Sequence, residues 1–451
     1  MKAKNYLIVG AGRSGIAAAQ MLTKLNENFT IYDGNSNLNT EAVSQQVADN
    51  GDIPFILGDV TSAELQGFDI CVVSPGVPLD TPVMLAVKEA GIPIYSEIEL
   101  AYLYDKGDII AITGTNGKTT TTSLVYEIMR SHDSDTLLVG NIEIPYTGLA
   151  LTSKDGGATV AEISSFQLET MITFRPKVSA ILNITPDHLD RHKTMENYAD
   201  IKKSIAKNQT ADDYCVLNYE DEVLREFGKT LGCKVIFFSS LRELTDGYFY
   251  KDGTIYFAEK GSVTPYINVD ETNLVGLHNY ENIMAAVAMT KSFGVDEETI
   301  KSALRRFTAV EHRIEYVATK KGVKYYNDSK GTNTDAAIKA IDAMPSTTVL
   351  IGGGYDKDAD FSEWVSHFPN KVRKLVLMGQ TREKIAEACD AIGFKDYCFA
   401  EDLKEAVDIC YESAKEGDCC LLSPACASWG MFKCYQQRGE MFKEYVRALE
   451  E

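Results

Sequence analysis

Residues 109–119 read Ile109-Ile110-Ala111-Ile112-Thr113-Gly114-Thr115-Asn116-Gly117-Lys118-Thr119, an apolar run followed by a glycine-rich loop. The apolar run predicts a buried strand, and the threonines after Lys118 predict the start of a helix. In such a loop the backbone N–H groups bind phosphates, the lysine neutralises β- and γ-phosphate oxygens, and the next hydroxyl binds Mg²⁺. The two glycines stand closer together than in the usual phosphate-binding loop. The stretch therefore indicates either a nucleoside triphosphate site or a plain turn.

A second glycine-rich turn, Gly10-Ala-Gly-Arg-Ser-Gly15, lies near the N-terminus. It follows a strand-like run at 6–9 and opens a helix-like stretch at 16–25, and residues 29–32 read as the next strand. The glycines allow a diphosphate to approach a helix N-terminus, and Asp33 stands where a ribose-binding acid is found in dinucleotide enzymes. This turn alone fits a nicotinamide-dependent dehydrogenase or simple close packing.

Strand-like and helix-like stretches alternate along the whole chain, which predicts an α/β fold with parallel sheets. At about 150 residues per domain, 451 residues suggest three domains. The pattern breaks near Tyr104–Asp108 and again near Thr308, so we expect domains at 1–97, 98–308 and 309–451. Further strands are expected at 70–73, 158–161, 179–182, 323–326, 348–351, 374–378 and 419–422, and a helix at 403–413.

The composition excludes some classes of function. The chain has 45 basic and 65 acidic residues and a net charge of −20, which argues against a nucleic-acid or anionic-membrane partner. No apolar run approaches the roughly 20 residues that span a bilayer. The ten cysteines form no Cys-x-x-Cys pair, so we expect reduced, buried thiols in a cytoplasmic protein.

Polar residues at expected strand ends supply further candidates for chemistry. Glu162 ends an apolar run and has the chemistry of a metal ligand, although strands often end in a carboxylate. His188 lies in a dense polar cluster, whereas Lys202 reads from its surroundings as a solvated surface lysine. The polar loops at 327–333, 352–357 and 422–428 each follow a strand, where parallel sheets bind ligands.

Taken in order along nearly the whole chain, these motifs resemble the Mur ligase family. The shortened loop at Lys118 is the form that this family uses. The motifs that carry the resemblance are Gly10-Ala-Gly-Arg-Ser-Gly15, Ser74-Pro-Gly-Val-Pro78, Gly114-Thr-Asn-Gly-Lys118, Glu162-Ile-Ser-Ser-Phe-Gln-Leu-Glu169, His188-Leu-Asp-Arg191, Gly276-Leu-His-Asn279, Glu311-His-Arg313, Asn327-Asp-Ser-Lys330, Leu422-Ser-Pro-Ala-Cys-Ala-Ser428 and Gln437-Arg-Gly439.

The resemblance implies a Rossmann-like N-terminal domain for a uridine nucleotide, a central P-loop-type ATPase domain and a Rossmann-like C-terminal domain for an amino acid. It implies an ATP-dependent, amide-forming ligase that adds D-glutamate to UDP-N-acetylmuramoyl-L-alanine through an acyl phosphate, in peptidoglycan precursor synthesis. The alternatives are another ligase of the superfamily, such as folylpolyglutamate synthase, the dehydrogenase, or a non-catalytic nucleotide sensor. We expect a cytoplasmic monomer with no nucleic-acid or membrane partner.

The resemblance also implies the site residues. Lys118, His188 and Lys202 are the expected catalytic residues. Lys202 is expected to react with CO₂ to give a carbamate, and the adjacent Lys203 is the alternative. The metal set, for two Mg²⁺ (or Mn²⁺) ions, is Thr119, Glu162, His188 and Lys202.

The substrate contacts that the resemblance implies fall into three sets. The expected ATP contacts are Gly114, Thr115, Asn116, Gly117, Lys118, Thr119, Thr120, Asn282, Arg313, Asp328 and Lys330. The expected precursor contacts are Arg13, Ser14, Asp33, Ser74, Gly76, Asn141 and His188. The expected D-glutamate contacts are Thr332, Lys357, Ser428 and Tyr435. Gly331 stands where the family usually has alanine, which we expect to loosen the loop that carries Thr332.

Overall fold

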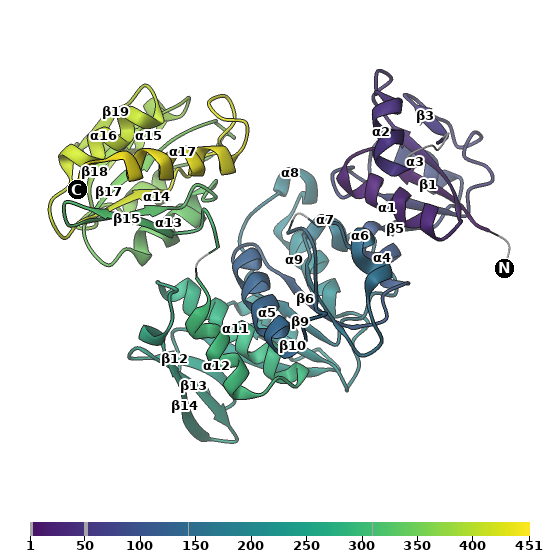
Figure 1. Ribbon diagram of the computed structural model, residues 1–451, viewed down its shortest axis with the longest axis horizontal. Coiled ribbons are helices and arrows are strands. Elements are labelled where there is room, and N and C mark those ends of the chain that lie inside the picture. The colour runs from purple at the N-terminus through teal and green to yellow at the C-terminus, as the bar shows by residue number, and fades with distance from the viewer. Residues whose placement is uncertain (1–2, 49–52, 143, 309) are drawn as a thin grey trace. The chain divides into compact units, whose positions relative to one another are not determined.

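The structure is a computed structural model that describes residues 3–48, 53–142, 144–308 and 310–451. Three β-sheets, built from residues 5–96, 108–268 and 315–422, each carry their own helices (Figure 1). The predicted α/β class with three domains is therefore confirmed, whereas the boundaries at 97 and 308 stay predictions. Met1–Asn268 with Glu281–Leu304 form one compact unit, and Val269–Tyr280 with Arg305–Glu451 form the other.

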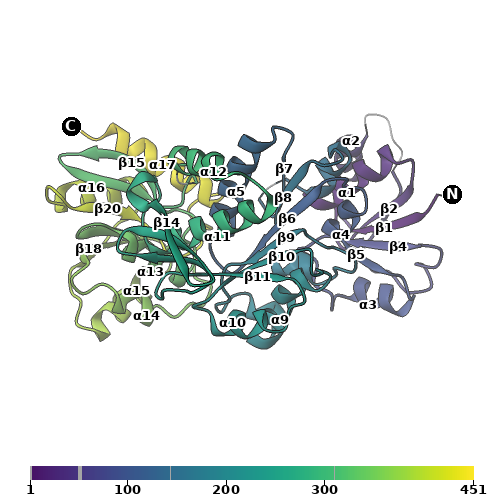
Figure 2. The same ribbon diagram turned by 90° about the horizontal axis from the view of Figure 1, so that it is seen from below.

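The N-terminal sheet is parallel throughout, in the strand order β3-β2-β1-β4-β5. Its elements are β1 (Asn5–Val9), α1 (Arg13–Lys24), β2 (Asn28–Asp33), α2 (Thr40–Val47), β3 (Phe55–Leu57), β4 (Ile70–Val73), α3 (Pro82–Glu89) and β5 (Ile94–Ser96). Side chains alternate across a strand, so Tyr6 and Ile8 pack with α1 and α2, and Leu7 and Val9 pack with α3. Figure 2 shows α1 and α3 on opposite faces of this sheet.

The central sheet has the order β14-β13-β12-β11-β10-β9-β6-β8-β7, and it is parallel from β7 to β12. Its first elements are α4 (Glu97–Tyr102), β6 (Asp108–Thr113), α5 (Lys118–His132), β7 (Leu137–Gly140), α6 (Tyr146–Leu149), β8 (Ala158–Glu162), α7 (Ser165–Leu168), β9 (Val178–Ile181), α8 (Leu189–His192), α9 (Met195–Lys203), β10 (Tyr214–Asn218) and α10 (Glu222–Gly228). They are followed by β11 (Lys234–Ser239), β12 (Gly247–Lys251), β13 (Thr254–Glu259), β14 (Ser262–Asn268), α11 (Leu277–Phe293) and α12 (Glu297–Arg306).

The sequence analysis did not predict the antiparallel strands β12, β13 and β14. Their signal was Asp252-Gly253, which joins β12 to β13 with a positive φ at both residues, as tight hairpin turns require.

The C-terminal sheet has the order β15-β16-β20-β17-β18-β19, and only its edge strand β15 is antiparallel. Its elements are β15 (Glu315–Lys320), β16 (Val323–Asn327), α13 (Thr334–Ala343), β17 (Thr348–Gly352), α14 (Ser362–Ser366), β18 (Val372–Leu377), α15 (Arg382–Ala391), β19 (Tyr397–Phe399), α16 (Leu403–Ser413), β20 (Cys419–Leu422) and α17 (Tyr435–Ala448). One face packs with α13, α14 and α15, and the other with α16 and α17.

The strands predicted from apolar runs all form, within a few residues of the expected limits. The first helix begins at Arg13 rather than at residue 16, because the chain passes from the glycine turn directly into helical backbone. No helix in the described part of the chain is long and apolar enough to cross a membrane.

A buried carboxylate ties the start of the central domain to a loop before β9. Glu99 of α4 is 1% exposed. It accepts backbone hydrogen bonds from Ile172 (3.0 Å), Thr173 (2.6 Å) and Phe174 (3.1 Å). Without the carboxylate these N–H groups would lose their acceptor inside the protein.

We therefore expect Glu99→Ala to lower the free energy of unfolding by about 3 kcal/mol, since buried donors are left unsatisfied. Urea unfolding followed by circular dichroism measures this. Glu196→Ala, in the exposed first turn of α9, is the control and should change stability by less than about 0.5 kcal/mol. Equal effects of the two substitutions would contradict the assignment.

Candidate functional site

The predicted phosphate-binding loop joins β6 to α5 and is anchored by Asn183, which follows β9. Asn183 accepts hydrogen bonds from the Thr115 N–H through its carbonyl (2.9 Å) and from the Asn116 N–H through its side chain (2.8 Å). Gly117 precedes the helix with a φ of +83°, and a Cβ there would lie 2.4 Å from Asn282 Oδ1. Asn282 Oδ1 in turn accepts a hydrogen bond from the Thr121 hydroxyl (3.1 Å). The loop is thus held between two asparagines, at the N-terminus of a long helix that favours anions.

Two lysines converge on the carbonyl of Gly114. Lys118 Nζ donates to it at 2.9 Å, and Lys202 Nζ donates to it at 2.8 Å. Lys202 is 1% exposed, and its nitrogen lies 4.6 Å from the centre of the Tyr198 ring. Burial, with the nearby charge of Lys118, holds the pKa of Lys202 well below its ordinary value. The interpretation of Lys202 as a solvated surface residue is therefore wrong.

Lys203, the alternative to Lys202, lies in a different setting. Its amine pairs with Asp200 at 3.1 Å, and a quarter of its side chain is exposed. Of these two described lysines, Lys202 is the one whose amine bonds the loop.

Glu162, the last residue of β8, has one carboxylate oxygen in use and one unpartnered. Oε1 accepts a hydrogen bond from Asn141 Nδ2 (2.7 Å), whereas no described residue hydrogen-bonds to Oε2. The side chain is 1% exposed. Glu162 pairs with Ile112 of β6, so it lies at the carboxyl ends of the strands, where the loop begins. A buried carboxylate oxygen of this kind suits a hard cation such as Mg²⁺, and Thr119 lies buried in the first turn of α5.

His188 directly precedes α8 with a left-handed backbone, and half of its side chain is exposed. Its Nε2 lies 3.5 Å from Asp187 Oδ2, and its ring meets the edge of Phe166 at 4.9 Å between centroids. The ring is therefore accessible for a ligand.

The N-terminal candidates surround the first glycine turn. Asp33 accepts hydrogen bonds from the backbone N–H groups of Ala11 (3.0 Å) and Asn35 (2.9 Å). Ser74 Oγ donates to the carbonyl of Gly10 (3.3 Å). Both side chains thus support the turn itself. Arg13 and Gly76 are exposed and Ser14 partly so.

The C-terminal candidates lie at the carboxyl ends of three neighbouring strands. Asp328, Lys330 and Thr332 follow β16, Lys357 follows β17, and Ser428 follows β20. The Tyr355 N–H donates to the Ala427 carbonyl (2.9 Å), which draws the loops of Lys357 and Ser428 together. Lys357 is exposed and Ser428 is 4% exposed.

Asp328 is a buried acid in a tight pocket. Ser423 Oγ donates to it at 2.7 Å, and burial raises its pKa to about 7, against the opposing charge of Arg313. A Cβ on Gly331 would lie 2.3 Å from Asp328 Oδ2. The glycine therefore gives the carboxylate room to approach the backbone, whereas the expected loosening of the loop stays a prediction.

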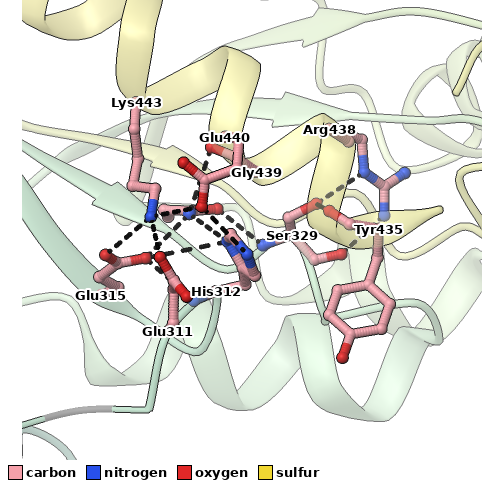
Figure 3. A network of polar contacts seen from close by, with 10 residues as sticks. Glu311, His312, Glu315, Ser329, Tyr435, Arg438, Gly439, Glu440 and Lys443 are labelled. Atoms are coloured by element: carbon pink, nitrogen blue, oxygen red, sulfur yellow. Dashed lines mark hydrogen bonds and ion pairs between the residues drawn. The ribbon is translucent and has the colours of Figure 1, made fainter.

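A polar network from α17 holds this loop (Figure 3). The buried Arg438 donates to the Ser329 hydroxyl (2.9 Å), the Ser329 carbonyl (2.7 Å) and the Cys426 carbonyl (3.2 Å). Lys330 Nζ lies 5.4 Å from the ring centre of Tyr435, the first residue of α17. One guanidinium thus bonds the backbone between Asp328 and Lys330 and the backbone two residues before Ser428.

The network also contains a group with metal-ligand spacing that the sequence analysis did not predict. Glu311, His312 and Glu440 have ligand atoms within 4.8 Å of one another, alone among the described residues in this respect. Lys443 Nζ bonds Glu311 and lies 2.8 Å from Glu440. Lys443 already supplies the positive charge that a metal ion would bring to these acids. The group is also made of other residues than the predicted metal set.

Comparisons with known proteins agree along the full chain. Residues 4–96 match the MurD-like N-terminal domain of Mur ligases, residues 112–290 the Mur ligase middle domain, and residues 312–426 the Mur ligase glutamate ligase domain. A UDP-N-acetylmuramoylalanine--D-glutamate ligase from Lachnospira eligens is 51% identical over 449 residues, covering 100% of both chains. The chain belongs to the Mur ligase family.

A second relative, a UDP-N-acetylmuramoylalanine--D-glutamate ligase from Lachnoclostridium phytofermentans, is also 51% identical to this Mur ligase, with 99% of both chains covered. Among solved structures, the UDP-N-acetylmuramate-alanine ligase of Thermotoga maritima has a TM-score of 0.61 at 18% identity and covers 99% of both chains. The MurF ligase of Thermotoga maritima in complex with ADP has a TM-score of 0.60 at 17% identity, covering 99% of this chain and 96% of the other. At these identities the structures show a shared fold.

The structure of this Mur ligase brings some predicted residues together and leaves others apart. Gly114, Lys118, Lys202, Glu162 and Asn282 gather at one end of the central sheet. Arg313, Asp328 and Lys330 belong to the other compact unit. Sequence reasoning missed the role of Asn183, whose signal was its place directly after β9. It also gave no role to Arg438, which was noted only within the motif Gln437-Arg-Gly439, because buried and exposed arginines look alike in sequence.

We expect Gly117→Ala to weaken ATP binding about 10-fold, because a left-handed alanine and a contact with Asn282 together cost at least about 1–2 kcal/mol. Titration with a fluorescent ATP analogue measures this. Gly148→Ala is the control, since nothing lies within 4 Å of a Cβ there, and its affinity should stay unchanged. An unaltered affinity in the Gly117 variant would show that the loop does not hold the nucleotide.

Proposed function

We propose that this Mur ligase joins D-glutamate to UDP-N-acetylmuramoyl-L-alanine, consuming ATP and releasing ADP and phosphate. The observation that carries the proposal is the 51% identity over full length to a relative named for this activity. The match to a MurD-like N-terminal domain supports it over a folate ligase. The matches of residues 112–290 and 312–426 to the Mur ligase middle and glutamate ligase domains argue against the dehydrogenase alternative.

The reaction needs activation because a carboxylate has no leaving group that an amine can displace. An oxygen of the L-alanyl carboxylate attacks the γ-phosphorus of ATP, and ADP leaves. The D-glutamate amine then attacks the acyl carbon of this acyl phosphate, loses a proton, and phosphate departs. Two anions meet in the first step, so fixed positive charge stabilises it. Lys118 at the loop supplies such charge.

The residues that would hold magnesium follow from the chemistry of the site. The unpartnered buried oxygen of Glu162 and the hydroxyl of Thr119 fit a first ion, and His188 with a modified Lys202 would hold a second. Mn²⁺ takes similar ligands. When bound, the ions neutralise phosphate and carboxylate charge. Thr115, Asn116, Thr120, Asn282, Arg313, Asp328 and Lys330 complete the proposed ATP contacts.

Lys202 fits carbamate formation better than a fixed cationic role. The neutral amine reacts with CO₂, and burial beside Lys118 favours the neutral form. The product is an anion, which would reverse the charge beside Lys118 and add oxygen ligands for Mg²⁺.

The remaining candidates divide between the two other substrates. Arg13, Ser14, Asp33, Ser74, Gly76, Asn141 and His188 are the proposed precursor contacts. Lys357 would pair with a D-glutamate carboxylate, with Thr332, Ser428 and Tyr435 beside it, since a dianion needs a cation and several donors. We place the enzyme as a monomer in the cytoplasm, where ATP and nucleotide-activated precursors of peptidoglycan are available.

The proposal predicts phosphate release only when ATP, UDP-N-acetylmuramoyl-L-alanine and D-glutamate are all present. With ¹⁸O in the L-alanyl carboxylate, mass spectrometry should find label in the released phosphate, because that oxygen bridges to phosphorus. Lys118→Ala should reduce the rate by about 100-fold or more, having lost charge at the transferred group. Turnover with a folate acceptor instead, or unlabelled phosphate, would refute the proposal.

The carbamate predicts a ¹³C resonance in the carbamate range when the protein is equilibrated with ¹³CO₂. The signal should weaken as the pH falls, since protonation removes the reactive neutral amine, and it should vanish in Lys202→Ala. Lys203→Ala is the matched control and should keep it. Short carboxylates should partly restore activity to Lys202→Ala. A signal that follows Lys203 instead would move the modification to that residue.

A further inference from the structure

Arg191 on α8 is a largely buried arginine to which the proposed mechanism gives no role. Its side chain is 12% exposed. The guanidinium carbon lies 4.1 Å from the centre of the Phe166 ring, in the short α7 that follows Glu162. Such stacking fixes the plane of the guanidinium and so the directions of its N–H groups.

Glu169 holds Arg191 through a two-pronged pair. Nε donates to Oε1 at 3.1 Å and Nη2 donates to Oε2 at 2.6 Å. The Glu169 side chain is 10% exposed. Two parallel bonds to a shielded carboxylate define the position of the arginine more narrowly than a single ion pair does.

The remaining N–H groups of Arg191 reach into the N-terminal domain. Nη1 donates to the carbonyl of Pro75 at 2.8 Å, and Nη2 donates to the carbonyl of Val77 at 3.2 Å. These carbonyls flank Gly76 in the segment 74–77, which we name the precursor loop. It carries Ser74 and Gly76, two of the proposed precursor contacts.

We propose that Arg191 is a positioning residue that sets the precursor loop against His188, and so holds the L-alanyl end of the precursor at the phosphoryl-transfer site. This rests on the proposed function. One guanidinium bonds the precursor loop, stacks on the segment after Glu162, and lies on the helix that begins next to His188. The geometry therefore joins three segments that each carry a proposed site residue.

The requirement is for a planar fork and not only for charge. Lysine carries the same charge as a single compact ammonium, so it can reach Glu169 or the carbonyls but cannot reproduce this set of bonds. The precursor loop would keep its fold and lose its fixed position. The cost should therefore appear in precursor binding and in the phosphoryl-transfer step, and not in ATP binding.

The test is steady-state kinetics of Arg191→Lys. We expect the KM for the UDP precursor to rise about 10-fold and kcat to fall about 10-fold, with the KM for ATP changed by less than about 2-fold. Arg175→Lys is the matched control. Arg175 forms an equivalent pair with Asp213, Nε to Oδ2 at 2.8 Å and Nη2 to Oδ1 at 3.3 Å, and it belongs to no proposed contact set. It should shift the melting temperature without moving either KM.

The proposal would be overturned if Arg191→Lys raised the KM values for the precursor, ATP and D-glutamate equally. It would also be overturned if Arg191→Lys behaved like Arg175→Lys. If Arg191→Lys does not fold, Glu169→Gln replaces it, because the amide keeps the shape of the partner but loses the charge that fixes the fork. A smaller rise confined to the precursor KM then supports the proposal, and unchanged kinetics refutes it. Calorimetric titration with UDP separates the proposed function from the role of Arg191. A wild-type protein without ligase activity overturns the proposed function alone. Equal UDP affinity of the wild type and Arg191→Lys, together with an unchanged KM for the precursor, overturns the role of Arg191.

Discussion

A single backbone carbonyl, that of Gly114, receives hydrogen bonds from two lysine side chains of different elements. Lys118 comes from the helix that the loop opens, and Lys202 comes from α9. Two ammonium groups on one acceptor would repel each other, and burial together with this repulsion holds the pKa of Lys202 well below its ordinary value. The arrangement is favourable once anions enter or once Lys202 loses its charge. The proposed phosphate binding and the proposed carbamate would each relieve this electrostatic strain.

The scaffold explains why such a site can be held together. In each parallel sheet the carboxyl ends of adjacent strands lie at one edge. Glu162 ends β8, the phosphate loop leaves β6, and Asn183 follows β9, which are neighbours in the central sheet. The C-terminal sheet repeats this arrangement with the loops after β16, β17 and β20. Loops that are distant in sequence thereby lie close together, although each loop directly follows its own strand.

Three buried or largely buried charged side chains outside the reacting groups bond to the backbone. Glu99 accepts three backbone N–H groups, Arg438 donates to two backbone carbonyls, and Arg191 donates to two more. A charged side chain that bonds to main-chain groups fixes loop geometry more firmly than a contact between two flexible side chains. This Mur ligase thus uses charged side chains to position its loops.

Apolar runs of strand length and glycine turns are local signals, so the amino-acid sequence by itself determined the α/β class, the three domains and many of the parallel strands, though not β3, β5, β7, β10, β11 or β19. It also located the loop around Lys118, whose chemistry is contained in adjacent residues. The antiparallel extension β12–β14 escaped notice, although Asp252-Gly253 marked its turn. Tertiary structure alone separated Lys202 from Lys203, gave Asp33 a backbone role and gathered partners for Arg191. Burial and hydrogen-bond partners depend on residues far away along the chain, so no local pattern can encode them.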